Sequence, residues 1–289
     1  MTVLPAGPAP GALAPSRYRS PIQYDEVAAE VPVGVVVPFD FALDWEYWRW
    51  LPAGVALHFS RTPFLQRDAG MYLARSVSRP STVDRVARTL RAVHPAAMLY
   101  ACTSGSFVGG VAGEAALREA MHAAGCARAV TSSGAAVAAL RLAGAERVAV
   151  ATPYSGSLTR HLVSFLDEAG IGVASADYLG LHRGIASVSQ STIIDLVRQA
   201  GSSGADAVFV SCTSLRTYGT VSQLEGELGI PVFTSNQVSL WAVLVAAGVL
   251  PRPADAPDPG WVLGGGDPMA RSTRILMDGA ASADALLFG

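Results

Sequence analysis

The stretches LYACTSGSF (residues 99–107) and VFVSCTSLRT (residues 208–217) nearly repeat each other. Each passes from an apolar run into Cys-Thr-Ser, and together they contain two of the 3 cysteines in the chain. An apolar run that stops at small polar residues is typical of a buried β-strand that enters a turn. The two stretches therefore predict two equivalent strand–turn units.

Outward from these units, short β-branched runs alternate with Ala-rich helical patterns. The predicted strands cover residues 33–38, 54–64, 97–104, 127–133, 147–155, 171–180, 207–214 and 230–236. The predicted helices cover residues 41–51, 81–94, 114–125, 134–144, 158–170, 192–201 and 237–248, with a further helix after the strand at 207–214. Uniformly apolar strands that alternate with helices form parallel sheets covered on both faces. We therefore predict an α/β fold.

The two halves of the chain match each other in order. VVVPFD (35–40) matches VATPYS (150–155), YACTSGS (100–106) matches VSCTSLR (210–216), and AVTSSGAAV (129–137) matches VFTSNQVSL (232–240). Such nearly constant offsets indicate duplication. We predict two pseudo-symmetric lobes, each a parallel sheet covered by helices, with the active site in the cleft between them. The first lobe covers residues 33–130, with 233–250 packing back on it, and the second covers 131–232.

The ends and the composition restrict the possible functions. Residues 1–32 are predicted to form a flexible Pro/Ala-rich extension, and residues 251–289 a loop-rich one with a short helix within 275–288 that docks or helps to pair subunits. A net charge of −2 gives no general attraction to nucleic acid or an anionic membrane. No apolar run reaches the ~18–20 residues that span a bilayer, and the N-terminus lacks a signal peptide's apolar core. We expect a cytoplasmic homo-oligomer that binds neither nucleic acid nor membranes.

Cys102 and Cys212 both follow a predicted strand at its carboxyl end, where open parallel sheets bind ligands. The small residues that come next let backbone N–H groups turn toward an anion, and a helix N-terminus adds positive potential. The same field is expected to lower the thiol pKa from its free value of ~8.5. Two such loops, face to face, would hold a small carboxylate with one sulfur on each side.

A lone cysteine at a strand end is more often a small buried hydrophobe. The matched pair favours a functional role for Cys102 and Cys212. Cys126 has no partner motif, and we interpret it as inert filling.

With these features the chain resembles the aspartate/glutamate racemase superfamily, and within it the branch of maleate cis-trans isomerases and arylmalonate decarboxylases. The resemblance covers residues 33–250. It is carried by VVVP, CTSGS, ATPY, and SCTSLRT followed by GIPVFTSNQVSLWAV. The motifs that follow the two cysteines in amino-acid racemases, Asn/Thr-Ala-His and Thr-Glu/His, are absent.

The resemblance implies a cofactor-independent, metal-free reaction on a small carboxylate. Arylmalonate decarboxylases keep only the second cysteine, whereas this chain has both, which favours isomerase chemistry. By resemblance, Cys102 adds as thiolate to the C=C bond of a maleate-like substrate, the new single bond rotates, and elimination gives the trans alkene. Cys212 protonates and deprotonates the intermediate. The alternatives are a racemase or decarboxylase of the same superfamily, of arylmalonate or ectoine-utilisation type, and a non-enzymatic carboxylate-binding protein.

The resemblance also suggests residues that bind the substrate. Thr103 and Ser104 follow the first cysteine, and Thr213 and Ser214 follow the second. Tyr154 of ATPY falls on the family's site tyrosine, and its hydroxyl could donate to a carboxylate. The alternative is a rim aromatic that only packs.

Three further candidates lie where the chain departs from maleate isomerases. Their Val-Pro-Ser-Ser-Asn run reads Val-Pro-Phe-Asp-Phe here, so Phe41 takes the place of the asparagine, and Tyr178 replaces the asparagine of the second lobe. Two aromatics in place of two amides suggest a ligand larger or less charged than maleate. Asp40 would repel a dicarboxylate. It is interpreted either as a site residue or as the cap of a helix that starts near Ala42.

We predict that activity on the true substrate survives EDTA and exhaustive dialysis. The sequence shows neither a cluster of metal ligands nor a dinucleotide fingerprint, so the chemistry is assigned to side chains alone. Turnover is measured before and after each treatment. A loss of activity that a divalent metal restores would contradict this assignment.

Overall fold

The computed structural model describes residues 30–251 and 270–289, and its strands form two parallel sheets. In spatial order, the first contains β2 (Val55–Arg61), β1 (Val31–Val37), β3 (Ala97–Tyr100) and β4 (Ala129–Thr131). The second contains β6 (Gly172–Tyr178), β5 (Arg147–Thr152), β7 (Ala207–Val210) and β8 (Val232–Thr234). The strand order is the same in both four-stranded sheets, which confirms the predicted fold class.

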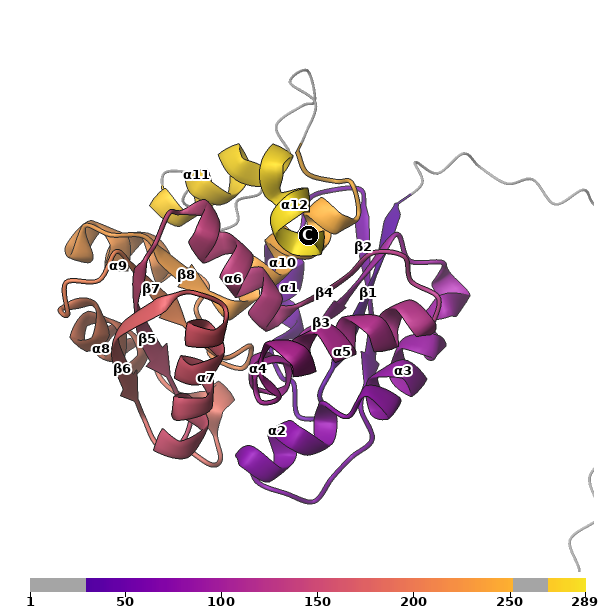
Figure 1. The fold of residues 1–289 in the computed structure, drawn as a ribbon, viewed down its shortest axis with the longest axis horizontal. Coiled ribbons are helices and arrows are strands. Elements are labelled where there is room, and N and C mark those ends of the chain that lie inside the picture. The colour runs from indigo at the N-terminus through magenta and orange to yellow at the C-terminus, as the bar shows by residue number, and fades with distance from the viewer. Residues whose placement is uncertain (1–29, 252–269) are drawn as a thin grey trace, which may run out of the picture.

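Helices connect the strands and cover both sheets (Figure 1). The first half contains α1 (Asp44–Arg49), α2 (Met71–Val77), α3 (Pro80–Thr89), η1 (Leu90–Val93), α4 (Thr103–Phe107), α5 (Gly110–Ala123) and α6 (Ser132–Leu142). The second contains α7 (Gly156–Glu168), η2 (Ile185–Ser187), α8 (Gln190–Gly201), α9 (Val221–Leu228) and α10 (Ser235–Ala246). The chain ends with α11 (Arg271–Asp278), η3 (Gly279–Ser282) and α12 (Ala283–Phe288).

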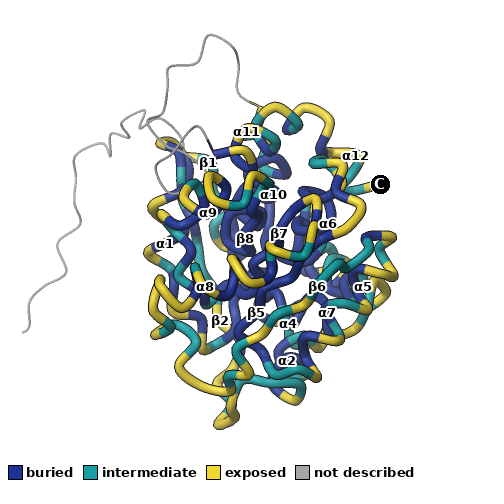
Figure 2. The backbone as a smooth tube through the Cα atoms, turned by 90° about the vertical axis from the view of Figure 1, so that its left-hand side faces the viewer, coloured by how far each residue is buried: buried dark blue, intermediate teal, exposed yellow. Residues whose placement is uncertain are grey.

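The central strands are apolar throughout because helices cover both of their faces. Every residue of β3 and β7 is buried, and β7 lies in the dark interior in Figure 2. The edge strands β2 and β6 are only partly buried. Because all the strands of each sheet are parallel, their carboxyl ends meet at one edge of that sheet.

Helices α6 and α10 lie between the two sheets and pack against each other (Figure 1). All 12 residues of α10 are buried. This helix follows β8 of the second sheet, yet it contacts β3 and β4 of the first. Its Trp241 indole N–H donates to the Leu276 carbonyl oxygen at 2.8 Å, which ties α10 to α11. α10 therefore links both sheets to the C-terminal helices.

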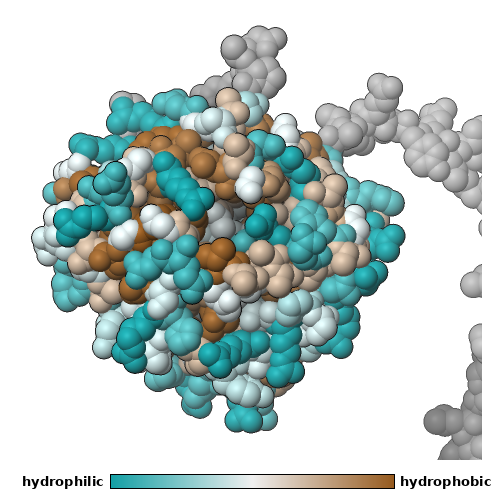
Figure 3. Space-filling view, in the orientation of Figure 1, coloured by the Kyte–Doolittle hydropathy of each residue, from teal (hydrophilic) through white to brown (hydrophobic). Residues whose placement is uncertain are grey.

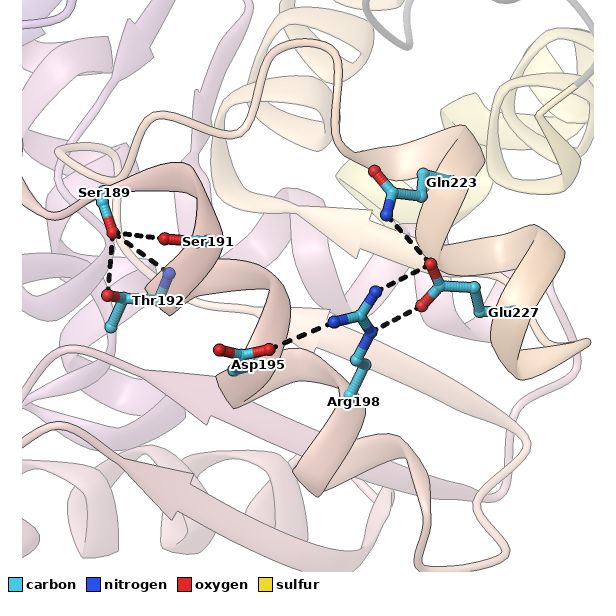
Figure 4. A network of polar contacts seen from close by, with 7 residues as sticks. All are labelled: Ser189, Ser191, Thr192, Asp195, Arg198, Gln223 and Glu227. Atoms are coloured by element: carbon cyan, nitrogen blue, oxygen red, sulfur yellow. Dashed lines mark hydrogen bonds and ion pairs between the residues drawn. The ribbon is translucent and has the colours of Figure 1, made fainter.

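Polar contacts fix the ends and outer faces of the second-half helices. The Ser189 hydroxyl accepts from the Thr192 N–H and caps α8 (Figure 4). Farther along α8, Arg198 binds Glu227 of α9 through two hydrogen bonds of 2.6 and 2.9 Å (Figure 4). On the face shown in Figure 3, hydrophilic side chains cover most of the rim, and hydrophobic ones are exposed mainly toward the middle.

Several elements differ from those predicted. β3 and β7 end before the cysteines, α1 is shorter than predicted, and α2 and α4 were not predicted. Both missed helices are short and begin without a side-chain cap, so the usual start signal is absent. Residues 1–29 and 252–269, which hold most of the predicted extensions, lie outside the described residues.

The predicted C-terminal helix is observed as parts of α11 and α12 joined by η3. α12 docks on α6 and α10. Across the described ranges, no helix has both the length and the apolar character needed to cross a bilayer.

We predict that Leu240→Ala lowers the free energy of unfolding by ~2–5 kcal/mol, because it leaves a cavity in the fully buried helix α10. Leu286→Ala, on the partly buried face of α12, is the matched control and is expected to cost clearly less. Urea unfolding followed by circular dichroism measures both. Equal losses in the two variants would show that α10 is not the centre of the core.

Candidate active site

A cavity of about 320 Å³ is lined by residues from both halves of the molecule. The lining residues come mainly from loops at the carboxyl ends of the strands. They include Pro38 and Asp40 after β1, Cys102, Thr103 and Ser104 after β3, Tyr154 and Ser155 after β5, and Cys212, Thr213 and Ser214 after β7. The two Cys-Thr-Ser units therefore face one cavity.

Cys102 lies at the N-terminus of α4, as its N-cap residue. The residue is 5% exposed, and its Sγ atom lies 3.8 Å from the Ser104 hydroxyl oxygen. Its carbonyl oxygen accepts from the Ser106 N–H at 2.9 Å, which closes the first turn of the helix. The thiol thus reaches the cavity from a tightly held turn.

Cys212 has the unusual backbone angle φ +138°, which side-chain-bearing residues rarely adopt. Such a conformation persists only where the surroundings impose it. Here the Cys212 N–H donates to the Ser235 hydroxyl at 2.9 Å, and the Ser214 N–H donates to the Cys212 Sγ atom at 3.3 Å. The strain therefore lies at the residue that presents the second thiol.

A single buried hydroxyl connects the two cysteine loops. The Ser235 Oγ atom accepts from the Cys212 N–H and from the Thr103 hydroxyl, both at 2.9 Å. It donates to the Val210 carbonyl oxygen at 3.5 Å. Sequence reasoning did not single out Ser235, although its match with Ser132 in the repeat was the available signal.

A buried carboxyl group supports the loop that follows Cys212. The Glu46 Oε1 atom accepts from the Thr217 N–H and hydroxyl at 3.3 and 2.9 Å, and from the Asn236 side-chain amide at 3.1 Å. Glu46 is 0% exposed. Burial raises its pKa to about 7 despite these donors.

The expectation of lowered thiol pKa values is wrong for this structure. Burial raises the pKa of Cys102 to about 11 and that of Cys212 to about 12. The Gly105 and Ser214 N–H groups lower the respective values, but the charge of Asp40 raises both. The helix after Cys102 has only 5 residues, so its positive end is weak. Both thiols are therefore protonated near neutral pH.

Asp40 lines the cavity and caps no helix. α1 begins at Asp44 with Leu43 as its N-cap residue, so the capping interpretation is wrong. The surrounding protein raises the pKa of Asp40 by burial, against the opposing effects of its own backbone N–H and of Arg61. Arg61 is itself bound to Asp44 at 2.8 Å. A carboxyl group that forms no ion pair with the described residues thus faces the two thiols.

Tyr154 is buried and lines the cavity, as predicted for a site residue. Its hydroxyl oxygen accepts from the Ser211 hydroxyl at 3.5 Å. A hydrogen bond from this hydroxyl also lowers the pKa of Cys212. Tyr154 is therefore positioned to act on the second thiol as well as on a ligand.

Of the predicted site residues, Phe41 and Tyr178 do not line this cavity. Phe41 is 3% exposed and packs in the core against Tyr47 and Phe59, with ring centroids 5.4 and 6.2 Å away. Tyr178 ends the edge strand β6 and is 53% exposed. The apolar lining comes instead from residues that the sequence did not indicate: Leu73, Ala74, Val77, Leu158, Leu181 and Ile185.

Two loops that sequence reasoning missed, after the edge strands β2 and β6, also line the cavity. Arg183 binds Asp68 at 2.6 Å, and the Ala69 N–H donates to the His182 carbonyl oxygen at 3.0 Å, so the loops join across the halves. Arg67 also lines the cavity. These loops have no apolar periodicity, but their place at the carboxyl ends of strands was a usable signal.

The described ranges contain no group of three or more His, Cys, Asp or Glu side chains placed to hold a metal ion.

A family model described as arylmalonate decarboxylase matches residues 77–257, more than half of the chain. An arylmalonate decarboxylase from Bordetella bronchiseptica is 29% identical over 228 residues, which cover 76% of this chain and 92% of the relative. A maleate isomerase from Nocardia farcinica is 29% identical over 158 residues, covering 52% of this chain and 63% of the relative.

This chain is also similar to a crystal structure of the liganded form of an arylmalonate decarboxylase double mutant. In that mutant, cysteine replaces a glycine and serine replaces a cysteine. The TM-score is 0.70 at 28% identity, and the match covers 77% of this chain and 95% of that one. These findings confirm the resemblance inferred from the motifs.

We predict that Asp40→Asn accelerates alkylation of both Cys102 and Cys212 by iodoacetamide about two- to tenfold at a fixed pH. Loss of a negative charge near the thiols lowers their pKa values, and each unit changes the thiolate fraction tenfold. Mass spectrometry of the separate peptides gives each rate, with Cys126 as the internal reference. Asp84→Asn, which removes the same charge from α3, is the control. Unchanged rates at both site cysteines would disprove the charge effect.

Proposed function

Because the chain belongs to the arylmalonate decarboxylase family, we propose that it is a cofactor-independent enzyme that isomerises small carboxylates with two cysteines. One observation carries this proposal: Cys102 and Cys212 line a single cavity from matching positions of the two halves. A second cysteine opposite the first supplies a proton donor and acceptor on the other side of a substrate. The maleate isomerase relative supports the reaction class.

The loops offer groups that can hold a carboxylate between the sulfurs. Ser104 and Ser214, which follow Cys102 and Cys212 in the two Cys-Thr-Ser units, line the cavity. The hydroxyls of Thr103 and Thr213 instead donate within the protein, to Ser235 and to the Ala101 carbonyl oxygen. We assign carboxylate binding to Ser104, Ser214 and the Tyr154 hydroxyl, and a supporting role to the two threonines.

We assign the first step to Cys102, the N-cap residue of α4, which is the role that the resemblance to maleate isomerases implies for the first cysteine. The Cys102 sulfur forms a bond to one carbon of the C=C unit, and the π electrons move into the neighbouring carboxylate. Cys212 gives its proton to the adjacent carbon and takes up the proton that Cys102 released. The new C–C single bond rotates, and reversal of both steps breaks the C–S bond and releases the trans alkene.

A decarboxylase is the second candidate. The apolar lining, with Leu73, Val77 and Leu181 among its members, favours a substrate with an apolar substituent. In this reaction, loss of CO₂ leaves an enediolate, and Cys212 protonates its carbon. The arylmalonate decarboxylase relative supports this alternative.

A screen of small mono- and dicarboxylates in D₂O separates the candidates. Proton NMR detects the alkene isomer for an isomerase, and CO₂ release with one deuterium incorporated for a decarboxylase. Release of CO₂ without any isomerisation would replace the first proposal by the second. A protein that binds a carboxylate without turnover would exclude both.

We predict that Cys102→Ala abolishes turnover and any covalent adduct, because the nucleophile is lost. Cys212→Ala should slow turnover by the ~10²–10⁴-fold typical of a lost proton-transfer group, and leave an adduct on Cys102. Cys212→Ser is expected to retain slightly more activity. Steady-state kinetics and intact-protein mass spectrometry measure these effects, with Cys126→Ala as the control. An adduct that maps to Cys212 and survives loss of Cys102 would reverse the two roles.

A further inference from the structure

Each cavity cysteine has a buried tyrosine hydroxyl beside it. Tyr154, which follows β5, lowers the pKa of Cys212 through its hydroxyl, and Tyr100, the last residue of β3, does the same for Cys102. Tyr100 therefore ends the strand that precedes its cysteine, whereas Tyr154 follows a strand that neighbours the one before Cys212.

The two tyrosines are not equivalent in the internal repeat. Tyr154 matches Phe39 in the first half, and Tyr100 matches Val210 in the second. Neither Phe39 nor Val210 has a hydroxyl group. The halves thus reach the same pairing of thiol and phenol from different positions, and duplication alone does not account for Tyr100.

Gly105 provides the space in which the Tyr100 hydroxyl and the Cys102 thiol approach each other. A methyl group at Gly105 would lie 2.4 Å from the Tyr100 oxygen and 3.1 Å from the Cys102 Sγ atom. The matching residue of the other half is Leu215. The glycine of CTSGS is therefore required by this close approach.

Tyr100 is 0% exposed and is not part of the cavity lining, so it acts on a ligand only through Cys102. Its hydroxyl donates to the Val77 carbonyl oxygen at 3.1 Å. Val77 is the last residue of α2, where carbonyl groups have no partner within the helix. The single Tyr100 hydroxyl proton is thus donated to the Val77 carbonyl oxygen, which has no helical partner, while Cys102 is protonated.

We propose that Tyr100 is a positioning residue for Cys102: the Tyr100 hydroxyl turns from the Val77 carbonyl oxygen to the Cys102 sulfur when the thiol proton passes to Cys212 during turnover, or to hydroxide in solution. A hydrogen bond to an anionic sulfur is charge-assisted and stronger than one to a neutral carbonyl. Asp40 opposes the ionisation of Cys102 by its charge, whereas the Gly105 N–H and the Ser104 and Tyr100 hydroxyls favour the thiolate. The inference depends on the proposed function only in that Cys102 must react as thiolate.

Tyr100→Phe tests this role without any substrate. Alkylation of Cys102 by iodoacetamide at a fixed, mildly alkaline pH should slow about tenfold, because a hydrogen bond to a charged group is lost. Cys212 and Cys126 in the same molecules should keep their rates. Tyr47→Phe, which removes the hydroxyl of another fully buried tyrosine, should leave all three rates unchanged.

Site-specific 3-fluorotyrosine at position 100 is a second variant, whose expected effect on the Cys102 rate has the opposite sign. It nearly preserves packing, so it serves as the test if Tyr100→Phe does not fold. Its more acidic phenol is a stronger donor, so Cys102 should react faster than in the unmodified protein, and Cys212 should not. An unchanged Cys102 rate, or an equal change at all three cysteines, would overturn the proposal. If Cys102 responds while Cys102→Ala retains full turnover, the proposed function fails and the role of Tyr100 stands.

Discussion

The Ser235 hydroxyl holds the two cysteine loops in one arrangement. It accepts from the Cys212 N–H of one loop and from the Thr103 hydroxyl of the other, and it donates to Val210 at the end of β7. One hydroxyl has one proton and two acceptor sites, so all of its bonding capacity is used. Because Ser235 begins the fully buried helix α10, the spacing of the two thiols depends on how that helix packs between the sheets.

The site combines internal symmetry with local departures from it. Ser132, which matches Ser235, likewise donates to the carbonyl oxygen of the last strand residue, Tyr100. The side chains around the thiols do not follow this symmetry: Asp40 matches Ser155, and Gly105 matches Leu215. A symmetric backbone therefore presents two thiols in different electrostatic surroundings. Such a difference is what a reaction with a distinct nucleophile and proton donor requires.

The sequence predicted the fold class because central parallel strands must be apolar along their whole length. Cys102, Cys212, Tyr154 and Asp40 line one cavity. Their closeness follows from the predicted strands, since parallel strands place their carboxyl ends together. Phe41 lies outside this lining, because the chain turns back into the core after β1. Motif spacing does not determine to which side of such a turn a residue points.

The thiol pKa values could not be predicted from sequence, because they depend on how completely both loops are enclosed. The positive potential at a helix end is a local property that a motif suggests, whereas desolvation arises from the whole assembly of two halves. The same reason applies to the two loops after β2 and β6 that line the cavity. Asp68 and Arg183 lie in unpatterned loops, and only the folded structure brings them together.

Glu46 links the folding of this chain to proton uptake. Its pKa rises from 4.5 to about 7 on burial. Between these values the folded protein keeps a proton that the unfolded chain has released, so the free energy of unfolding falls as the pH rises through this window. The raised pKa of Asp40 acts in the same direction. Weakly acidic solution therefore favours the folded state through two carboxyl groups. Asp40 lines the cavity with the two thiols, and Glu46 binds Thr217 in the loop that follows Cys212.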